Sequence, residues 1–444
     1  MKKQHNQWAS KVGFILATAG AAIGLGNLWK FPYLMGKNGG FSFLAAYLIF
    51  ICILGVPVMI AEMTLGRKTK HNPVQAYAQI HPRARIVGIF GVLAAFLILS
   101  YYSVIGGWIL KYAFSYLTSF KAPADFAAYT AGAVEPIVWH FIFMALTALV
   151  CYFGVRGIEK ASKLMMPALF VIVVVIIVRS VTLPGAADGL AFIFKPDMSN
   201  FSMQSVSAAL GQVFYSLSLC MGITVTYGSY LSKKENIPKS CLTVAGLDTG
   251  MAVLAGIAIF PAVFSFGLEP AQGPTLIFET LPNVFASLGG GVFFAVLFFL
   301  LIFFAALTSA IALLEVTVSF AIDNLKWKRS SAVFAIAALI FIIGIPSSLA
   351  FGPLADLKIL NYNFFDFIGM ITDNILLPLG GIFMCYYLGW RWQPRLLVEE
   401  IEQAGVKFKL AKLWIFSIRF ITPVLVLIVT VTGFISIYHV VAGG

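Results

Sequence analysis

"GAAIGLGNLWKFP", Gly20 to Pro32, lies within an apolar stretch long enough to cross a bilayer, yet it contains three glycines, a polar Asn27 and a cationic Lys30. A backbone that unwinds at membrane depth survives only where it lines a cavity or is buried in protein, because its freed polar groups need partners. Glycine permits such unwinding, but small residues also let two helices pack closely. The stretch alone therefore leaves two interpretations open, a broken helix that serves a function or a tight helix contact.

The composition indicates a polytopic membrane protein. Of the 444 residues, 60% are hydrophobic and only 11% are charged, a balance that leaves a water-soluble domain nowhere to bury its apolar surface. No Pro-rich or Gly/Ser-rich linker divides the chain, so we expect one all-α domain over residues 1–444. Eleven segments reach the length of a membrane span, near residues 10–34, 41–65, 87–117, 136–154, 163–183, 205–231, 241–266, 291–322, 331–348, 366–389 and 413–438.

Lysine and arginine are concentrated on one side of these predicted spans. The N-terminus and the connections on its side carry 22 of the 30 Lys and Arg residues, which predicts a cytoplasmic N-terminus and an outside C-terminus. The formal net charge of +12 is thereby explained without nucleic-acid binding. Five single cysteines without a CxxC pair read as small core residues rather than a metal or redox site. An apolar connection at 267–291 without Lys or Arg predicts a helical lid.

A second interrupted span changes the balance between the two interpretations. "SAALGQVFYSLSLCMGITVTYGSYL", Ser207 to Leu231, combines small residues, hydroxyls and a glycine in its middle, Ser216 to Gly222. Two interrupted spans at corresponding positions of two five-helix halves indicate an inverted-repeat transporter with its site near the bilayer midplane. One half-helix end offers N–H groups to an anion, and another offers carbonyls to a cation. A zwitterion fits both ends.

Polar residues within the spans support a site of this kind. Glu62, Asp248 and Glu315 lie in apolar spans, where an ionisable group costs at least ~2.5 to 3.5 kcal/mol and is normally paired or faces a cavity. Thr308 and Ser309 lie in the middle of the eighth span. Together with carbonyls freed in the first span, their hydroxyls provide the oxygen ligands that a hard cation requires.

Several long motifs resemble the neurotransmitter:sodium symporters, and within that family its bacterial amino-acid transporters. They are "QWASKVGFILATAGAAIGLGNLWKFPY", "NGG", "GVPVMIAEMTLGR", "SYYSVIGGW", "GQVFYSLSLCMG", "FFAALTSAIALLE" and "NILLPLGG", in the family's order. The resemblance implies two inverted five-helix repeats, about 8–183 and 205–390, with unwound first and sixth helices and a peripheral eleventh helix at about 413–438. It also implies a bacterial cytoplasmic (inner) membrane location. These features of the fold are those of the family that the motifs resemble.

The resemblance also assigns site residues. The first of two Na⁺ ions is expected at Ala22, Asn27, Ser216 and Asp248, and the second at Gly20, Ile23, Ala305, Thr308 and Ser309. The amino-acid substrate is expected to contact Ala22, Leu25, Gly26, Ile98, Tyr102, Tyr215, Ser216, Ser218, Met221, Ser309 and Leu313. Substrate carboxylate completes the first ion site, so sodium and substrate raise each other's affinity.

Departures from the family pattern sharpen these expectations. Asp248 stands where the family usually has Asn, and Ala252 stands where a hydroxyl or carboxylate is expected, although Tyr47, Gln212 and Ser216 match the family's chloride ligands. Because the Asp248 carboxylate supplies the negative charge that a bound chloride ion would otherwise supply, we predict transport that does not need chloride.

The predicted gates also depart from the family. Lys30 and Asp366 stand at the outer gate, where lysine lacks the bidentate geometry of the usual Arg. At the inner gate Tyr230 and Asp323 match, but His5 replaces an Arg, and either a neighbouring Lys substitutes or the gate is weak and pH-sensitive. Glu62 corresponds to a buried Glu that accepts hydrogen bonds from the unwound sixth span.

Together these features predict sodium-coupled symport of hydrophobic amino acids by alternating access. The apolar lining and the flexible Met221 favour aromatic amino acids over leucine. Alternatives are a leucine or branched-chain symporter, or a sodium-dependent amino-acid sensor without net transport. Five scattered histidines, of which only His140 is predicted in a core span, offer no nucleophile–base or metal cluster, so we do not expect an enzyme. The lipid bilayer is the other expected partner, and the sequence is silent on oligomeric state.

Overall fold

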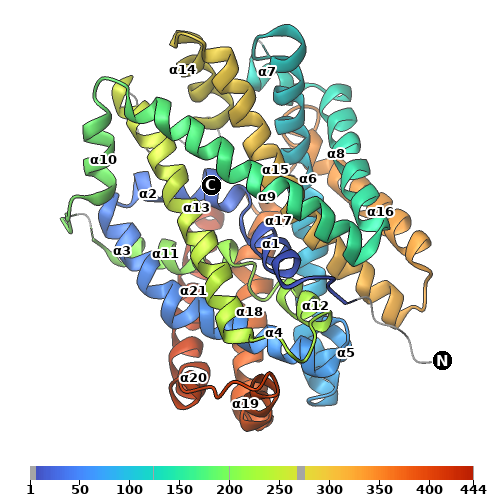
Figure 1. The fold of residues 1–444 in the computed structure, drawn as a ribbon. Coiled ribbons are helices and arrows are strands. Elements are labelled where there is room, and N and C mark those ends of the chain that lie inside the picture. The colour runs from blue at the N-terminus through green and yellow to red at the C-terminus, as the bar shows by residue number, and fades with distance from the viewer. Residues whose placement is uncertain (1–6, 124, 200, 268–275, 444) are drawn as a thin grey trace.

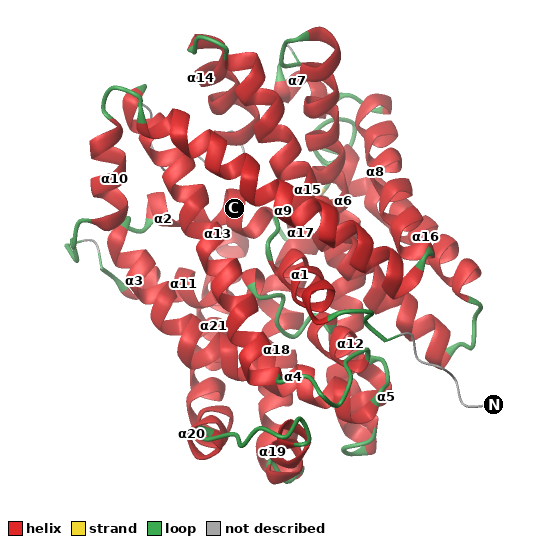
Figure 2. Ribbon diagram, viewed as in Figure 1, coloured by secondary structure: helices red, strands yellow, loops and turns green. Residues whose placement is uncertain are grey.

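The computed structural model describes residues 7–123, 125–199, 201–267 and 276–443. Within these ranges the regular secondary structure is helical, apart from one antiparallel pair of two-residue strands, β1 (Lys358–Ile359) and β2 (Tyr362–Asn363). Figure 2 shows helices throughout the molecule, joined mostly by short connections. The predicted all-α class is confirmed.

The first half of the chain contains helices α1 to α10. They are α1 (Lys11–Ala22), α2 (Phe31–Lys37), α3 (Phe41–Phe50), α4 (Val56–Thr69), α5 (Pro73–Ala78), α6 (Arg85–Ser119), α7 (Phe126–Ala131), α8 (Val134–Tyr152), α9 (Gly154–Val181) and α10 (Ala186–Phe194). α9 begins at Gly154, earlier than the predicted span 163–183, because the basic connection before that span is itself helical.

The second half contains helices α11 to α21. They are α11 (Met203–Ser216), α12 (Ile223–Ser229), α13 (Ile237–Ser265), α14 (Leu281–Ser287), α15 (Gly291–Asn324), α16 (Arg329–Leu349), α17 (Phe364–Ile371), α18 (Leu377–Tyr386), α19 (Arg395–Glu402), α20 (Ala411–Phe416) and α21 (Thr422–Ala442).

Short turns of other helix types extend or join these elements. The five-residue π-helical turns are η1 (Gly26–Lys30), η2 (Ile51–Gly55), η4 (Leu276–Thr280), η5 (Thr372–Leu376), η6 (Tyr387–Arg391) and η7 (Ser417–Ile421), and η3 (Pro82–Ala84) is a 3₁₀ turn. The helical part of the predicted lid is η4 with α14, and residues 268–275 of that prediction lie outside the described residues. Phe278 of η4 stacks on Phe126 of α7 at 4.6 Å.

Among the described residues, nine helices are long and apolar enough to cross a membrane, or ten if the bent pair Lys11–Ala22 and Gly26–Lys37 is one span. The predicted span at 205–231 is divided into α11 and α12, each too short to cross alone. The count of eleven spans therefore stays a prediction, as does the division into two repeats. The last candidate, Ala411–Ala442, has 22% of its most apolar window buried, against 72% for Phe41–Thr69, so it lies at the periphery.

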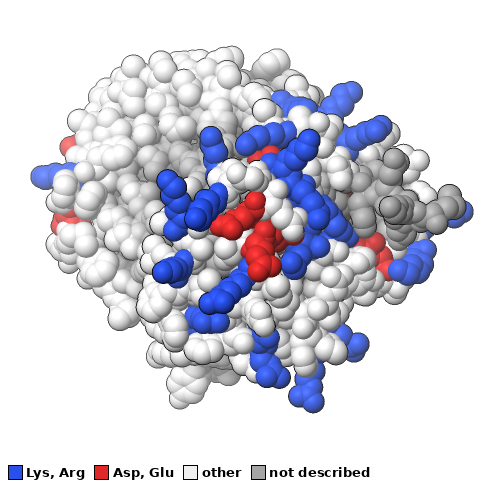
Figure 3. Space-filling view, turned by 60° about the horizontal axis from the view of Figure 1, so that its bottom comes forward, with Lys and Arg blue, Asp and Glu red and all other residues white. Residues whose placement is uncertain are grey.

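One end of the molecule is strongly basic. Figure 3, in which the lower end of Figure 1 comes forward, shows many Lys and Arg side chains gathered there around a few acidic ones. α5, α19 and α20 lie at this end (Figure 1). Exposed Lys233 and Lys234 belong to the connection after α12, while exposed Arg391 ends η6 and exposed Arg395 begins α19. We call this end the basic face.

Candidate functional site

The first helix break lies directly after α1. The helix ends at Ala22, Ile23 takes an extended conformation (φ −73°, ψ 95°), and the helical stretch Gly26–Lys37 continues at an angle of 51°. A Cβ atom on Gly24 would lie 2.5 Å from the Ser309 Oγ atom and 3.0 Å from the Tyr102 hydroxyl. Close approach of the unwound backbone to α6 and α15 therefore explains the glycine here.

The second break separates α11 from α12. Between them Ser218, Cys220 and Gly222 have φ values of 52°, 61° and 74°, in the left-handed region. For Ser218 and Cys220, which carry a Cβ atom, this conformation costs about 1–3 kcal/mol each and persists only when neighbouring groups hold it. Strain of this kind is typical of binding sites.

Glu62 of α4 holds the second break. Its Oε2 atom accepts hydrogen bonds from the Cys220 backbone N–H at 3.3 Å and from the Thr224 hydroxyl at 2.5 Å, and the Glu62 side chain is buried. The contact predicted between Glu62 and the unwound sixth span is thus present. It gives a partner to a backbone donor that the break removes from regular helix bonding.

A central cavity lies between the two breaks. Its free volume is about 30 Å³, room for only a few water molecules, so the lining side chains nearly fill it in this conformation. Every predicted substrate-contacting residue except Ser216 lines it. The full lining is Ala21, Ala22, Gly24, Leu25, Gly26, Ile98, Tyr102, Tyr215, Ser218, Met221, Ile223, Ser309 and Leu313.

The polar groups of this cavity come from the breaks. The Leu25 N–H, at the start of the second half of the broken first span, donates to the Tyr102 hydroxyl at 3.3 Å. The Ser218 hydroxyl donates to the carbonyl of Ala21, in the last turn of α1, at 3.0 Å. One part of the wall therefore offers donors to an anionic group, and another offers carbonyl oxygens to a cationic one. The remaining lining is largely apolar.

A buried cluster of oxygen atoms lies behind Ser216, which explains why this residue is absent from the cavity wall. Asp248 of α13 accepts hydrogen bonds from Asn27 Nδ2 at 2.8 Å, from Ser216 Oγ at 2.7 Å and from the Tyr47 hydroxyl at 3.2 Å. All four side chains are fully buried. The three side chains predicted for the first sodium ion are thus brought together, with Tyr47 added.

The donor set of this cluster fits a small hard cation. It combines a carboxylate, a hydroxyl and an amide, which are the oxygen ligands that such ions prefer. In this structure Asn27 turns its amide N–H₂ toward Asp248, and its Oδ1 atom accepts from the Gly24 N–H at 3.3 Å. A half-turn of the amide would present Oδ1 to a cation held between Asn27 and Asp248.

A second cluster of oxygen atoms joins α1 to α15. The Ser309 hydroxyl contacts the carbonyl oxygens of Gly20 at 3.3 Å and Ala21 at 3.2 Å. The Thr308 hydroxyl donates to the Ala305 carbonyl at 3.0 Å, and a Cβ atom on Gly20 would lie 3.2 Å from Thr308 Cβ. The residues predicted for the second sodium ion therefore meet between the broken helix and the eighth predicted span. Ile23 follows them in the break itself.

In this structure Lys30 pairs with Asp373, so the outer-gate pair Lys30–Asp366 stays a prediction. Lys30 Nζ lies 3.3 Å from Asp373 Oδ2 and 4.2 Å from the centre of the Tyr215 ring, while Asp366 accepts from the Asn363 side chain at 2.9 Å. All three charged residues line a larger cavity that adjoins the central one at Leu25 and Tyr215. Asp366 and Asp373 are seven residues apart, close to two helical turns, so both face this cavity, and the deeper carboxylate is nearer to Lys30.

On the side of the basic face, aromatic and charged side chains close the site. The Tyr230 hydroxyl donates to Glu315 Oε1 at 2.8 Å, and Arg329 Nη2 lies 2.5 Å from Glu315 Oε2. Trp8 packs against Tyr230 and donates from its indole N–H to the Tyr227 carbonyl at 3.1 Å.

Two further residues, Asp323 and His5, were predicted at the inner gate. Asp323 accepts from the Asn72 N–H at 3.2 Å, and His5 is outside the described residues. Sequence analysis missed Arg329, because the run "NLKWKRS" served only as a topology signal. Its adjacency to a span that contains a buried Glu315 was the available clue.

This combination defines a class of protein. Two discontinuous helices meet inside a bundle of membrane-spanning length, a small and mainly apolar cavity lies between them, and two clusters of oxygen ligands flank it. Such an arrangement is typical of secondary transporters that bind a solute together with cations.

Comparison with known proteins identifies the family. Residues 5–127 and 130–442 match the model of the sodium:neurotransmitter symporter family, and the chain belongs to that family. It is 40% identical to the sodium-dependent transporter YhdH of Bacillus subtilis over 95% of this chain and 96% of that protein. It is 32% identical to the sodium-dependent transporter MJ1319 of Methanocaldococcus jannaschii over 99% of this chain and 92% of that protein.

A solved structure supports the same assignment. The crystal structure of MhsT in complex with L-phenylalanine superposes with a TM-score of 0.89 at 42% identity and covers 97% of this chain and 100% of that one. The predicted family and its fold are confirmed. The protein is a multi-pass sodium-coupled transporter and not an enzyme.

Proposed function

We propose that this protein carries out sodium-coupled symport of hydrophobic amino acids, with aromatic ones preferred over leucine. The observation that carries the proposal is the central cavity, which both helix breaks border and which is otherwise mainly apolar. Carboxylate and ammonium groups of an amino acid match the Leu25–Tyr102 and Ala21–Ser218 polar groups. MhsT, crystallised with L-phenylalanine, supports an aromatic substrate.

Two sodium ions are proposed as co-transported cargo. One binds among Asn27, Ser216 and Asp248, and the other binds between the α1 carbonyls and Thr308 and Ser309. Because Asp248 supplies a negative charge inside the first cluster, transport does not require chloride. Curated relatives at 26–27% identity, such as the GABA transporter 2 of Macaca fascicularis, are named sodium- and chloride-dependent, so this chain departs from them at that point.

The proposed orientation places the basic face in the cytoplasm of a bacterium, with the C-terminus outside. The cavity around Lys30, Asp366 and Asp373 then lies on the outer side. The group around Trp8, Tyr230 and Arg329 closes the inner side. Alternating access requires hinge points, and the breaks at 23–25 and 217–222 provide them.

Uptake into proteoliposomes tests this proposal. Labelled tryptophan, phenylalanine, tyrosine and leucine are each supplied with an inward sodium gradient. We expect the labelled amino acid to accumulate inside the vesicles, more for the aromatic amino acids than for leucine. Accumulation should end when choline replaces sodium and should be unchanged when gluconate replaces chloride. Binding without accumulation would favour a sensor, and preference for leucine would refute the aromatic assignment.

A further inference from the structure

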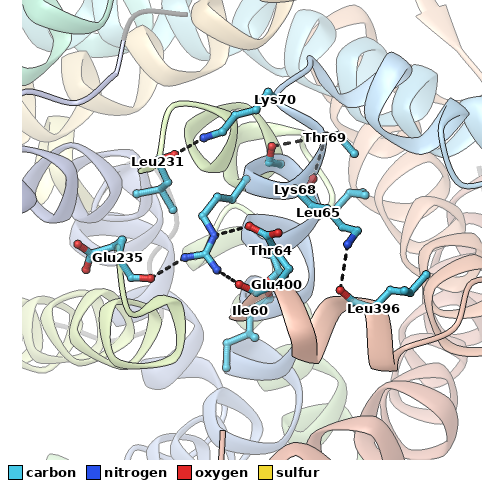
Figure 4. Close-up of polar contacts among 12 residues, drawn as sticks. Ile60, Thr64, Leu65, Lys68, Thr69, Lys70, Leu231, Glu235, Leu396 and Glu400 are labelled. Atoms are coloured by element: carbon cyan, nitrogen blue, oxygen red, sulfur yellow. Dashed lines mark hydrogen bonds and ion pairs between the residues drawn. The ribbon is translucent and has the colours of Figure 1, made fainter. Parts of the chain in front are cut away.

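A buried arginine joins three segments of the chain at the basic face. Arg67, in the last turns of α4, has no exposed surface. Its Nε atom lies 2.9 Å from Glu400 Oε1, its Nη1 donates to the Glu235 carbonyl at 2.6 Å, and its Nη2 donates to the Glu400 carbonyl. Figure 4 labels the two residues that Arg67 joins, Glu235 on the connection that follows α12 and Glu400 of α19. One side chain thus fixes the end of α4 to two segments far apart in sequence, the helix α19 and the connection that follows α12.

Two neighbouring lysines contact the same two segments, α19 and the connection that follows α12. Lys68 donates to the Leu396 carbonyl of α19 at 3.3 Å, and Lys70 donates to the Leu231 carbonyl (Figure 4). The end of α4 is therefore a cationic anchor made of Arg67, Lys68 and Lys70, placed where the helix dipole favours positive charge.

Helices α4 and α12 form one rigid unit. A Cβ atom on Gly66 would overlap the Val225 carbonyl oxygen, and one on Gly228 would lie 2.5 Å from the Met63 carbonyl oxygen. The two backbones are thus in direct contact at two glycines, and Glu62 adds its contacts to the start of α12. Contact this close at two points leaves little room for α12 to slide past α4.

Helix α19 is attached to this unit at its buried face. Leu397, Glu400 and Ile401 of α19 are buried, whereas Glu399 is exposed. After α19 the chain continues through α20 to the peripheral helix α21. The ion pair between Arg67 and Glu400 is therefore a charged link between the α4–α12 unit and the segment that leads to the last helix.

We infer that Arg67 and Glu400 are a positioning pair, which makes α19 move with the half-helix α12 when the site opens toward the basic face. The inference rests on the proposed alternating-access function. Replacing a buried ion pair by apolar residues is often neutral or stabilising, so stability alone does not account for this pair. The planar guanidinium fixes three acceptors in one geometry, which suits a device that sets the position of one helix on another.

Glu400→Gln is the main test variant, because the amide keeps the shape and one acceptor atom while it removes the charge. Glu399→Gln is the matched control on the exposed side of the same helix. We expect Glu400→Gln to keep the equilibrium sodium-dependent affinity for amino acid while its uptake turnover changes by about 2- to 30-fold, the range typical of residues that carry conformational coupling. We expect Glu399→Gln to behave as wild type.

A charge swap adds a second test of the geometry. The side chain that Arg67→Glu introduces has no N–H group to donate to the carbonyls of Glu235 and Glu400. The double variant Arg67→Glu with Glu400→Arg should therefore not restore turnover. Full rescue by the swap would show that only charge attraction matters and would overturn the positioning role. Loss of binding and turnover together in Glu400→Gln would show a purely structural role, with the same consequence.

Distances between spin labels measure the movement directly. Labels are placed at exposed Glu399, Lys234 and Lys328 after Cys52→Ser, since the other four cysteines are buried. Addition of sodium and amino acid should change the 399–328 distance but not the 399–234 distance, and Glu400→Gln should broaden the latter. Equal changes in both distances in wild type would overturn the inference. Sodium-driven uptake by wild type tests the proposed function separately. The effect of Glu400→Gln on the 399–234 distance can be measured whether or not the protein transports amino acids.

Discussion

Asp248→Asn removes one negative charge from the cluster that we assign to the first sodium ion. The carboxylate accepts from Asn27, Ser216 and Tyr47 at 2.8, 2.7 and 3.2 Å, and no exposed surface remains to it. An amide at this position keeps one acceptor atom but places an N–H₂ group against one of these donors or against the cation.

The size of the effect follows from electrostatics. A unit charge ~4 Å from a monovalent cation contributes about 4 kcal/mol at an effective dielectric constant of ~20. The lower cost of burying a neutral amide offsets part of this, which leaves ~2–4 kcal/mol. At ~1.4 kcal/mol per tenfold change, the sodium concentration for half-maximal binding should rise about 30- to 700-fold.

Sodium titration of labelled amino-acid binding to the purified protein measures this shift. Asp373→Asn is the control, because this carboxylate pairs with Lys30 in the adjoining cavity and lies outside the proposed ion cluster. Its sodium requirement should stay that of wild type. A requirement in Asp248→Asn within about threefold of wild type, which corresponds to ~0.7 kcal/mol, would refute the assignment of Asp248 as a sodium ligand.

Three further predictions concern packing, specificity and pH. Glu62→Ala leaves the buried Cys220 N–H and Thr224 hydroxyl without their acceptor, so thermal denaturation in detergent should show a loss of about 1–3 kcal/mol per donor; an unchanged Tm would contradict this role. Met221→Phe places a rigid ring in the cavity wall, and competition binding should show tryptophan losing at least ~10-fold relative to leucine; a parallel loss for both would contradict it. Burial, with Arg67 nearby, lowers the pKa of Lys70 to about 8, so between pH 8 and about 10.4, the usual lysine pKa, the unfolded chain binds more protons and stability rises with pH. The unfolding free energy of wild type minus that of Lys70→Met should therefore increase by about 1–2 kcal/mol from pH 7 to 10, after allowing for solvent screening. Thermal denaturation at each pH measures it, and a decrease would contradict the sign.

Sequence alone predicts the local breaks of this fold well. Glycines at 20, 24 and 26 and the polar Ser216–Gly222 segment mark both interruptions, because unwinding at membrane depth needs special residues. Glu62, Asp248 and Glu315 are also visible from sequence, since charges inside apolar spans are costly and stand out.

The sequence does not predict which charged side chains pair with one another at the surface and at the gates. Lys30 pairs with Asp373 and not Asp366, although both carboxylates lie on the same stretch of helix, because the angle of the broken first span decides which of them is nearer. The helix α19 was missed for a related reason. Its eight residues include four charged ones, so it lacks the long apolar pattern that identifies a span. Its place is defined by contacts with Arg67 and Lys68 at the end of α4.

The proposed sites also provide a physical basis for coupling between solute and ions. Ser309 lines the central cavity and at the same time contacts the Gly20 and Ala21 carbonyls of the second oxygen cluster. Asn27 contacts Asp248 in the first cluster, while its Oδ1 atom accepts from Gly24 of the break that forms the cavity wall. A cation that reorients either side chain therefore reshapes the wall that an amino acid meets. Because binding free energies are reciprocal, an amino acid that orders this wall must raise the affinity for the cation by the same factor.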